Sequence, residues 1–414
     1  MAGYAVIDIE TTGLAAEGAD RIIEIGIVHV DAAGLAEAEY ETLVNPGRDL
    51  GPVHIHGIRG ADVAEAPGFG QVADRLLDLL ADRVLVAHNA TFEARFLRAE
   101  FARLGVTMPI TGADAVCTMR LATRFLPGAG RSLADCCAAF DIELSAAHEA
   151  IADARATATL LAAYLGIAPD DQYWCGQQRA GTSRLWPRSG IPSVPWLPRS
   201  RSSETGRPAT ERDFLERATA LLPPAVGGAG SLEYLALVDE ALADGLLSVD
   251  ETDGLLAAAT RMSIGTAARR SLHAQYFRDL VAAVWADGVL TDAEAERISA
   301  VGIMLGIPAA VIADGLVPPA PRPRRRLVPP VVVVPPTGLA PGSLVVLTGQ
   351  MRHPRSVYEA ELVLRGHRVH PAVTRDVDLV VAADVDSLSG KARKARQYGI
   401  PIASANWLDA LLGI

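Results

Sequence analysis

Hydrophobic and polar residues follow one another in the first part of the chain in a pattern that predicts strands and helices. Short apolar runs bounded by turn residues predict β-strands at 4–9, 21–30, 38–44 and 84–87. Apolar residues at helical spacing predict helices near 72–80, 91–104 and 148–165. Strands mixed with helices of this length are typical of an α/β domain, which we place at residues 1–168.

Two proline-rich segments separate this domain from the rest of the chain. Residues 169–210 and 317–341 keep no hydrophobic period, which is typical of linkers. Trp174, Trp186 and Trp196 could attach the first linker to a neighbouring surface.

An internal repeat occupies residues 211–316, between the two linkers. Two helical stripes match each other: Tyr234, Leu237, Val238 and Ala241 in the first copy, and Phe277, Leu280, Val281 and Val284 in the second. Each stripe leads to a helix C-cap glycine and a capping box, formed by Gly245, Ser248 and Glu251 in one copy and by Gly288, Thr291 and Glu294 in the other. The repeat predicts a small all-α domain of two helical hairpins.

The final segment, 342–414, returns to short strands and helices. Its strands are predicted at 344–347, 368–372, 379–382 and 400–403. Its helices are predicted at 355–364 and 391–398, with a closing helix that contains Trp407. We therefore expect a second, smaller α/β domain at the end of the chain.

Composition and charge narrow the classes of function. A net charge of −11 argues against general polycation binding to nucleic acid, but a nuclease remains compatible because a metal site needs a local excess of carboxylates. The four cysteines form no CxxC pair, which favours reduced thiols and a cytoplasmic protein. No apolar run approaches the ~20 residues that span a bilayer, and the chain starts with a strand in place of a signal peptide, so no membrane partner is expected.

Acidic residues stand in otherwise apolar elements of the first domain. Asp8 and Glu10 alternate with isoleucines on a strand, so both carboxylates leave the same face, where burial without a partner would be costly. Glu93 begins a helix directly after a strand, and His148 and Asp153 lie close together at the start of another helix. Convergent carboxylates with a nearby base are what two-metal phosphodiester cleavage requires.

Three segments resemble the exonuclease motifs of the DEDDh family, and they occur in the same order and at a plausible spacing. They are 8–13 (Asp-Ile-Glu-Thr-Thr-Gly), 88–93 (His-Asn-Ala-Thr-Phe-Glu) and 148–153 (His-Glu-Ala-Ile-Ala-Asp). The family includes the proofreading epsilon subunit of bacterial DNA polymerase III, RNase T and oligoribonuclease. The resemblance covers about residues 3–166. It implies an RNase H-like mixed sheet and a 3′→5′ exonuclease that releases nucleoside monophosphates.

The resemblance also implies a role for each matching residue. Two divalent ions, Mg²⁺ or Mn²⁺, would be held by Asp8, Glu10, Glu93 and Asp153, with Asp8 between both ions. His148 would be the general base. Contacts to the substrate, single-stranded or 3′-ended DNA by preference, would come from Thr11, Gly13, Leu14, His56 and Asn89.

One position departs from the family pattern, because Glu93 stands where the second motif normally ends in Asp. The extra methylene keeps the charge but alters the geometry, and a ~1 Å error in positioning can cost on the order of 10²-fold in rate. Two alternatives therefore stay open. The chain could be an RNA exonuclease of the same fold, or a scaffold that binds DNA ends or partners through a weak nuclease site.

The two later domains carry resemblances of their own. The helical repeat is similar to the tellurite-resistance TerB-like domain, although capping boxes explain its Ser, Thr and Glu residues without a ligand. Residues 342–414 resemble a BRCT domain, which implies recruitment of a protein partner. In phosphate-binding members a Thr-Gly pair and a lysine grip a phosphate, and Thr348, Gly349 and Lys394 match them here. The alternative is an ordinary turn and a surface lysine.

Overall fold

The computed structural model describes residues 2–126, 130–144, 148–199, 222, 228–242, 249–285, 290–318, 339–349, 351–383 and 390–414. Contacts within the chain define two compact units. The first contains residues 1–120 and 144–318, and the second contains residues 121–143 and 319–414.

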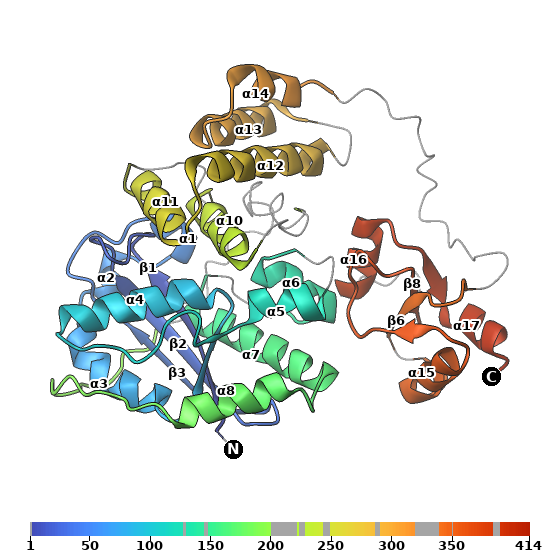
Figure 1. Cartoon of the computed structure of the whole chain (residues 1–414), viewed down its shortest axis with the longest axis horizontal. Helices are drawn as coiled ribbons and strands as arrows, with labels where there is room; N and C mark the ends of the chain where they lie inside the picture. The colour runs from blue at the N-terminus through green and yellow to red at the C-terminus, as the bar shows by residue number, and fades with distance from the viewer. Residues whose placement is uncertain are drawn as a thin grey trace. The chain divides into compact units, whose positions relative to one another are not determined.

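A five-stranded mixed sheet forms the centre of the first unit, in the order β3-β2-β1-β4-β5 (Figure 1). Its strands are β1 (Tyr4–Thr11), β2 (Ile22–Val30), β3 (Ala36–Leu43), β4 (Val84–Ala87) and β5 (Val116–Cys117). Strands β1, β2 and β3 pair antiparallel, whereas β4 and β5 run parallel to β1. The mixed sheet expected from the sequence is confirmed, and β5 is an additional short strand.

Helices cover both faces of this sheet, which explains why every residue of β2 is buried. The helices of this part are α1 (Val53–His56), α2 (Gly60–Val63), α3 (Phe69–Leu80), α4 (Ala90–Arg103), α7 (Ala150–Ile167) and α8 (Gln172–Thr182). Helix α5 (Thr118–Phe125) starts in the first unit and ends in the second. Ala5, Ile7 and Ile9 of β1 share a core cluster with side chains of α3 and α4. The other face of β1 and β2 is covered by α7.

Helix α7 approaches the sheet closely because β2 carries a glycine beneath it. A Cβ atom added to Gly26 would lie 2.4 Å from the backbone carbon of Ala150 and from the nitrogen of Ile151. By length and mean hydropathy (1.2) α7 is the one helix among the described residues that could cross a membrane. Its 18 residues pack on β1 and β2, and 61% of them are buried, as in the core helix of a folded domain.

The segment treated as a linker after this domain lies against it over much of its described length. Residues of α8 follow the first domain directly, and Trp174 is 3% exposed with its indole N–H donating to the carbonyl of Ala168 at 2.9 Å. Trp186 and Trp196 pack partly buried against the core of the sheet domain. Tryptophans therefore attach residues 169–199 to the domain as expected. The sequence predicts a linker without secondary structure in this segment, and helix α8 corrects that interpretation.

Among the described residues of the rest of the first unit there are five helices: α10 (Ala229–Leu242), α11 (Val249–Arg261), α12 (Thr266–Val284), α13 (Asp292–Met304) and α14 (Ala309–Gly315). The capping box of Thr291 and Glu294 is present at the start of α13. Gly245, Ser248 and Gly288 lie outside the described residues, as does the side chain of Glu251. Arg120 reaches Glu233 of α10 at 2.9 Å. The described elements here are helices, and their assignment to a separate all-α, TerB-like domain stays a prediction.

The second unit contains a four-stranded parallel sheet in the order β7-β6-β8-β9. Its elements are β6 (Leu344–Thr348), α15 (Arg355–Leu364), β7 (Arg368–Val369), β8 (Leu379–Ala382), α16 (Gly390–Tyr398), β9 (Ile402–Ser404) and α17 (Ala405–Leu412). Helix α6 (Leu133–Phe140) packs on α16, so residues 121–143 group with this sheet, although the sequence places them in the first domain. The BRCT assignment stays a prediction.

Candidate active site

Strand β1 carries two acidic residues near its end, on the face that α7 covers. Asp8 lies opposite Gly26 in the β1–β2 ladder, and Glu10 lies opposite Glu24. Since directly opposed residues share a face of the sheet, Asp8, Glu10 and Glu24 all project to the side where α7 begins. Glu10 is 8% exposed and the Glu24 side chain is 1% exposed, so these two carboxylates are buried opposite each other. Asp8 is partly exposed and shares their face, as the i, i+2 spacing predicts.

The start of α7 supplies the residues that meet this face. His148 has a backbone φ of +64°, in the left-handed region that histidine adopts less rarely than most residues. Its N–H donates to Asp153 Oδ2 at 3.0 Å, which closes the turn before the helix. Ligand atoms of Glu10, His148 and Asp153 all lie within 4.8 Å of one another, a spacing at which one metal ion could bind all three.

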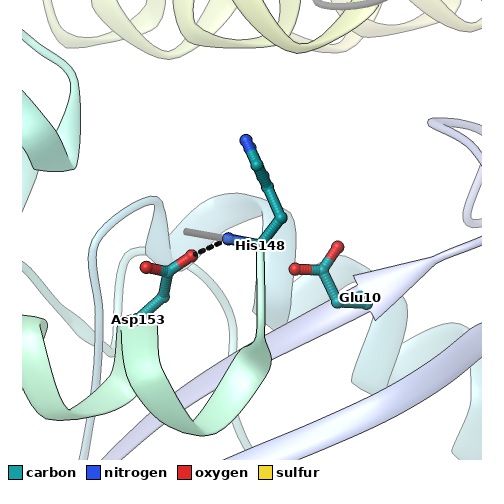
Figure 2. Close-up of side chains that lie close together, drawn as sticks. All are labelled: Glu10, His148 and Asp153. Atoms are coloured by element: carbon teal, nitrogen blue, oxygen red, sulfur yellow. Dashed lines mark hydrogen bonds between the residues drawn. The ribbon is translucent and has the colours of Figure 1, made fainter. Parts of the chain in front are cut away.

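Figure 2 shows how these three side chains lie. Glu10 comes from the end of β1 and Asp153 from the first turn of α7, with His148 between them. The imidazole of His148 extends beyond both carboxylates, and the hydrogen bond of its backbone to Asp153 is drawn as a dashed line. A nitrogen base beside two carboxylates is the arrangement that the three motifs predict.

Glu93 lies in the first turn of α4, and its charge acts on Asp8. Its side chain is 4% exposed, and its Oε2 atom is buried with no hydrogen-bond partner. An unpaired buried carboxylate oxygen is costly, and a cation removes that cost. Carboxylate oxygens are the ligands that hard divalent cations prefer, so the carboxylates present fit a divalent metal and leave the imidazole of His148 to act as a base. The longer side chain of Glu93, in the place of the usual Asp, is thus compatible with a metal ligand.

Electrostatics at the site disfavour ionised carboxylates in the absence of a cation. Burial raises the pKa of Asp8 well above its usual range, and the neighbouring Asp153 raises it further. The pKa of Glu10 is raised well above its usual range by burial and then by Glu24, and burial likewise raises the pKa of Glu93. Asp8 lies outside the three-residue cluster but interacts with it through these charges. A metal site requires carboxylates whose ionised form is stabilised by a nearby positive charge.

A tight loop follows β1 and is held by its own hydrogen bonds. The Thr11 hydroxyl donates to the carbonyl of Gly13 at 2.8 Å, and Asp20 accepts from the Thr12 hydroxyl at 3.0 Å. A Cβ atom on Gly13 would lie 2.6 Å from Asp20 Oδ2, so only glycine fits there without a shift. This gives Thr11 and Gly13 a structural role in holding the loop, and their contact with substrate stays a prediction.

The remaining substrate-binding candidates differ from one another in their surroundings. Asn89 is partly exposed at the start of α4. Leu14, expected near the terminal base, is 6% exposed and lies beside α11. A Cβ atom added to Gly254 of α11 would lie 3.6 Å from the Cβ atom of Leu14.

His56 is 2% exposed, and its ring is held by the backbone: Nδ1 accepts from the N–H of Ile58 at 3.0 Å and Nε2 lies 3.2 Å from the carbonyl of Leu50. Backbone groups engage both ring nitrogens, which gives His56 a structural role, and its contact with substrate stays a prediction.

Three functional candidates escaped the motif analysis: Glu24, Gly26 and Arg199. Glu24 Oε2 accepts the N–H of Ala150 at 3.2 Å, which ties β2 to the start of α7. Burial raises the pKa of Glu24 to about 7, and Arg199 acts in the opposite direction. An acidic residue within an apolar strand was the signal available for Glu24, the same signal that identifies Asp8.

In the second unit two of the three expected phosphate-binding residues are enclosed, whereas Gly349 is exposed. Thr348 is 3% exposed and Lys394 is 4% exposed, and the ammonium of Lys394 pairs with Asp135. Burial lowers the pKa of Lys394 to about 8. Lys394 is therefore not the surface lysine of the alternative interpretation, and phosphate binding by Thr348, Gly349 and Lys394 stays a prediction that requires Asp135 to release Lys394.

Comparisons with known proteins match the sheet domain. The family described as Exonuclease matches residues 5–161. The epsilon subunit of DNA polymerase III from Rickettsia typhi is 33% identical over 169 residues, covering 39% of this chain and 73% of that protein, and the Escherichia coli epsilon subunit is 33% identical over 171 residues, covering 39% and 70%.

Two further similarities extend over a smaller share of the other protein. A Mycobacterium tuberculosis protein with the name bifunctional exonuclease/endonuclease is 38% identical over 172 residues, covering 39% of this chain, and the chain spans only 26% of its length. The crystal structure of E. coli exonuclease I with a dT13 oligonucleotide is 20% identical, covers 41% of this chain and 42% of that one, and has a TM-score of 0.36. A score of this size carries no argument about the site.

Proposed function

The chain belongs, through its N-terminal domain, to the exonuclease family that includes the DNA polymerase III epsilon subunit, and on that premise we propose that it is a metal-dependent 3′→5′ DNA exonuclease. One observation carries the proposal. Glu10, His148 and Asp153 converge from two elements to within 4.8 Å of one another. The unpaired buried oxygen of Glu93 supports the same site.

Each residue has a part in the hydrolysis of the terminal phosphodiester. Asp8, Glu10, Glu93 and Asp153 would hold the divalent ions, which polarise the phosphoryl group and stabilise the leaving oxygen when bound. A ring nitrogen of His148 accepts the proton of the attacking water. The water oxygen bonds to phosphorus while the bond from phosphorus to the 3′-oxygen breaks, and a nucleoside 5′-monophosphate is released. General-base catalysis of this kind contributes about 10²- to 10⁴-fold.

Substrate, polarity and metal dependence can be tested together. A single-stranded DNA labelled at its 3′ end and the same strand labelled at its 5′ end are incubated with the full chain, with magnesium or with a chelator, beside RNA of the same sequence. We expect magnesium-dependent release of labelled mononucleotide from the 3′-labelled DNA and a descending ladder from the 5′-labelled DNA. The Asp153→Asn variant is the control for a contaminating nuclease.

The same experiment separates the alternatives. Faster release from RNA would make the chain an RNA exonuclease of the same fold. Immediate release of mononucleotide from the 5′-labelled strand would reverse the polarity. Equal product from the parent and the Asp153→Asn variant would contradict an enzymatic site and leave the scaffold interpretation.

A further inference from the structure

A strap of residues 184–199 runs from the end of α8 along the outer edge of the sheet domain. The N–H of Leu43 donates to the carbonyl of Leu197 at 2.8 Å, and the N–H of Leu197 donates to the Thr42 hydroxyl at 3.1 Å. The N–H of Val194 donates to the carbonyl of Gln71 at 3.1 Å. These bonds join the strap to β3, which is the edge strand of the sheet, and to α3.

The strap places Arg199 at the base of the candidate active site. One guanidinium nitrogen of Arg199 lies 3.3 Å from Glu24 Oε2, and the other donates to the carbonyl of His56 at 2.8 Å. The Arg199 side chain is 19% exposed and that of Glu24 is 1% exposed, so water screens this ion pair only weakly. The fork of the guanidinium serves two acceptors at once, which an ammonium cannot do with the same geometry.

Glu24 connects Arg199 to the start of α7. The same Oε2 atom that faces Arg199 accepts the N–H of Ala150, the first residue of α7. A carboxylate at a helix N-terminus also interacts favourably with the helix dipole. His148 and Asp153 lie on either side of Ala150 in the chain, so the position of this N–H fixes where both side chains stand.

Without Arg199, Glu24 would be a buried carboxylate with no compensating charge, directly opposite Glu10 in the β1–β2 ladder. Breaking a buried pair by removing one partner leaves an uncompensated charge and is strongly destabilising locally. The start of α7 is the element that can give way, because it is held to β2 by that same carboxylate.

We propose that Arg199 is a positioning residue of the exonuclease site: by pairing with Glu24 it fixes the start of α7, and through it the placement of His148 and Asp153 against Glu10. The inference rests on the proposed function. It adds a residue that lies beyond the family match at 5–161, so the working site includes the strap as well as the matched domain.

The test uses the full chain with three single variants. Arg199→Met removes the charge and keeps the apolar stem, and Arg199→Lys keeps the charge without the fork. Arg188→Met is the matched control, because Arg188 ties the same strap to Asp78 of α3, away from the cluster. For each protein, kcat and KM are measured on a single-stranded DNA. The rise in melting temperature on adding Mn²⁺ alone gives a readout that needs no turnover.

We expect Arg199→Met to lower kcat by about 10- to 100-fold, as a displacement approaching 1 Å would, with KM within about threefold of the parent. The Mn²⁺-induced rise in melting temperature should shrink in the same variant. Arg199→Lys should recover part of both effects, and Arg188→Met should match the parent. Adding Glu24→Gln to Arg199→Met should restore part of kcat, because the amide oxygen still accepts from Ala150 and leaves no charge to compensate.

Two results would overturn the inference in an active parent. One is a kcat for Arg199→Met equal to that of the parent. The other is an equal loss in Arg199→Met and Arg188→Met, which would assign the effect to attachment of the strap in general. An inactive parent with an intact Mn²⁺ response would count against the proposed function instead, so the two failures are distinguishable.

Discussion

Replacing Gly26 by alanine should misplace the catalytic helix while leaving the domain folded. Gly26 lies on β2 beneath the start of α7, and it is opposite Asp8 in the sheet. An alanine Cβ at this position would stand 2.4 Å from the carbon and 2.5 Å from the oxygen of Ala150. Both neighbours are backbone atoms, so no side-chain rotation can relieve the contact.

The size of the effect follows from that distance. Ordinary carbon contacts lie at about 3.5 Å or beyond, so the start of α7 must move outward by roughly 1 Å. A displacement of ~1 Å at a catalytic group costs on the order of 10²-fold in rate. Inserting a methyl group into a packed interface costs about 1–3 kcal/mol, which a domain of this size should survive. We therefore expect a kcat about 100-fold lower in a protein that still unfolds cooperatively.

The assay compares Gly26→Ala with Gly166→Ala, a matched change on the same helix. Nothing lies within 4 Å of a Cβ added to Gly166, which is exposed within α7. That change should keep kcat and raise stability by up to about 1 kcal/mol, because alanine favours helix over glycine. If Gly26→Ala retained a kcat within threefold of the parent, with the melting temperature measured alongside, close backbone approach at Gly26 would not be what positions the site.

Further predictions concern the cluster itself. Asp8→Ala should reduce turnover by several orders of magnitude, since it removes a ligand from the proposed metal site, and near-parental hydrolysis in magnesium would contradict that role. His148→Ala should be slow by about 10²- to 10⁴-fold and partly rescued at high pH, because hydroxide replaces a missing base; a pH–rate profile checks this.

Glu93→Asp restores the usual motif and should match or exceed the parent in kcat, whereas a loss would show a site tuned to the longer side chain. Burial raises the pKa of Asp8, Glu10 and Glu93, so folding favours their protonated forms and the metal-free protein should lose stability as pH rises above about 4.3. The difference between the melting temperatures with and without Mn²⁺ should increase as the pH rises. A difference that stays constant with pH would show that the metal binds elsewhere.

Local sequence patterns were sufficient to predict most elements of the fold. The strand expected at 84–87 is β4 (Val84–Ala87), and the helix expected at 355–364 is α15 (Arg355–Leu364). Both elements carry an apolar period bounded by turn or polar residues, so their own sequence determines them. Asp8 and Glu10 were identified in the same way, because a period of two places both on one face.

Features that depend on a distant partner could not be read from the sequence. Nothing near Arg199 indicates that it reaches Glu24, because the contact depends on how the strap lies along the sheet. His56 offers two ring nitrogens in any sequence, and only the fold shows that backbone groups engage both. The basic sequence of α16 gives no sign that Lys394 is buried, because its partner Asp135 comes from α6, far away in the chain.

The charge distribution connects the fold to the proposed chemistry. Asp8 and Glu10 stand on a core strand and Glu93 on a helix packed against it, so the three carboxylates cannot relax away from one another as exposed groups would. Arg199 pairs with Glu24, and its charge acts on Glu10 less than burial and the neighbouring carboxylates do. The other carboxylates keep raised pKa values and an unpaired oxygen, a cost that water cannot relieve in a buried site. Divalent cations would relieve it, and on the proposed function the same rigidity would present the carboxylates to the metal without reorganisation when the substrate arrives.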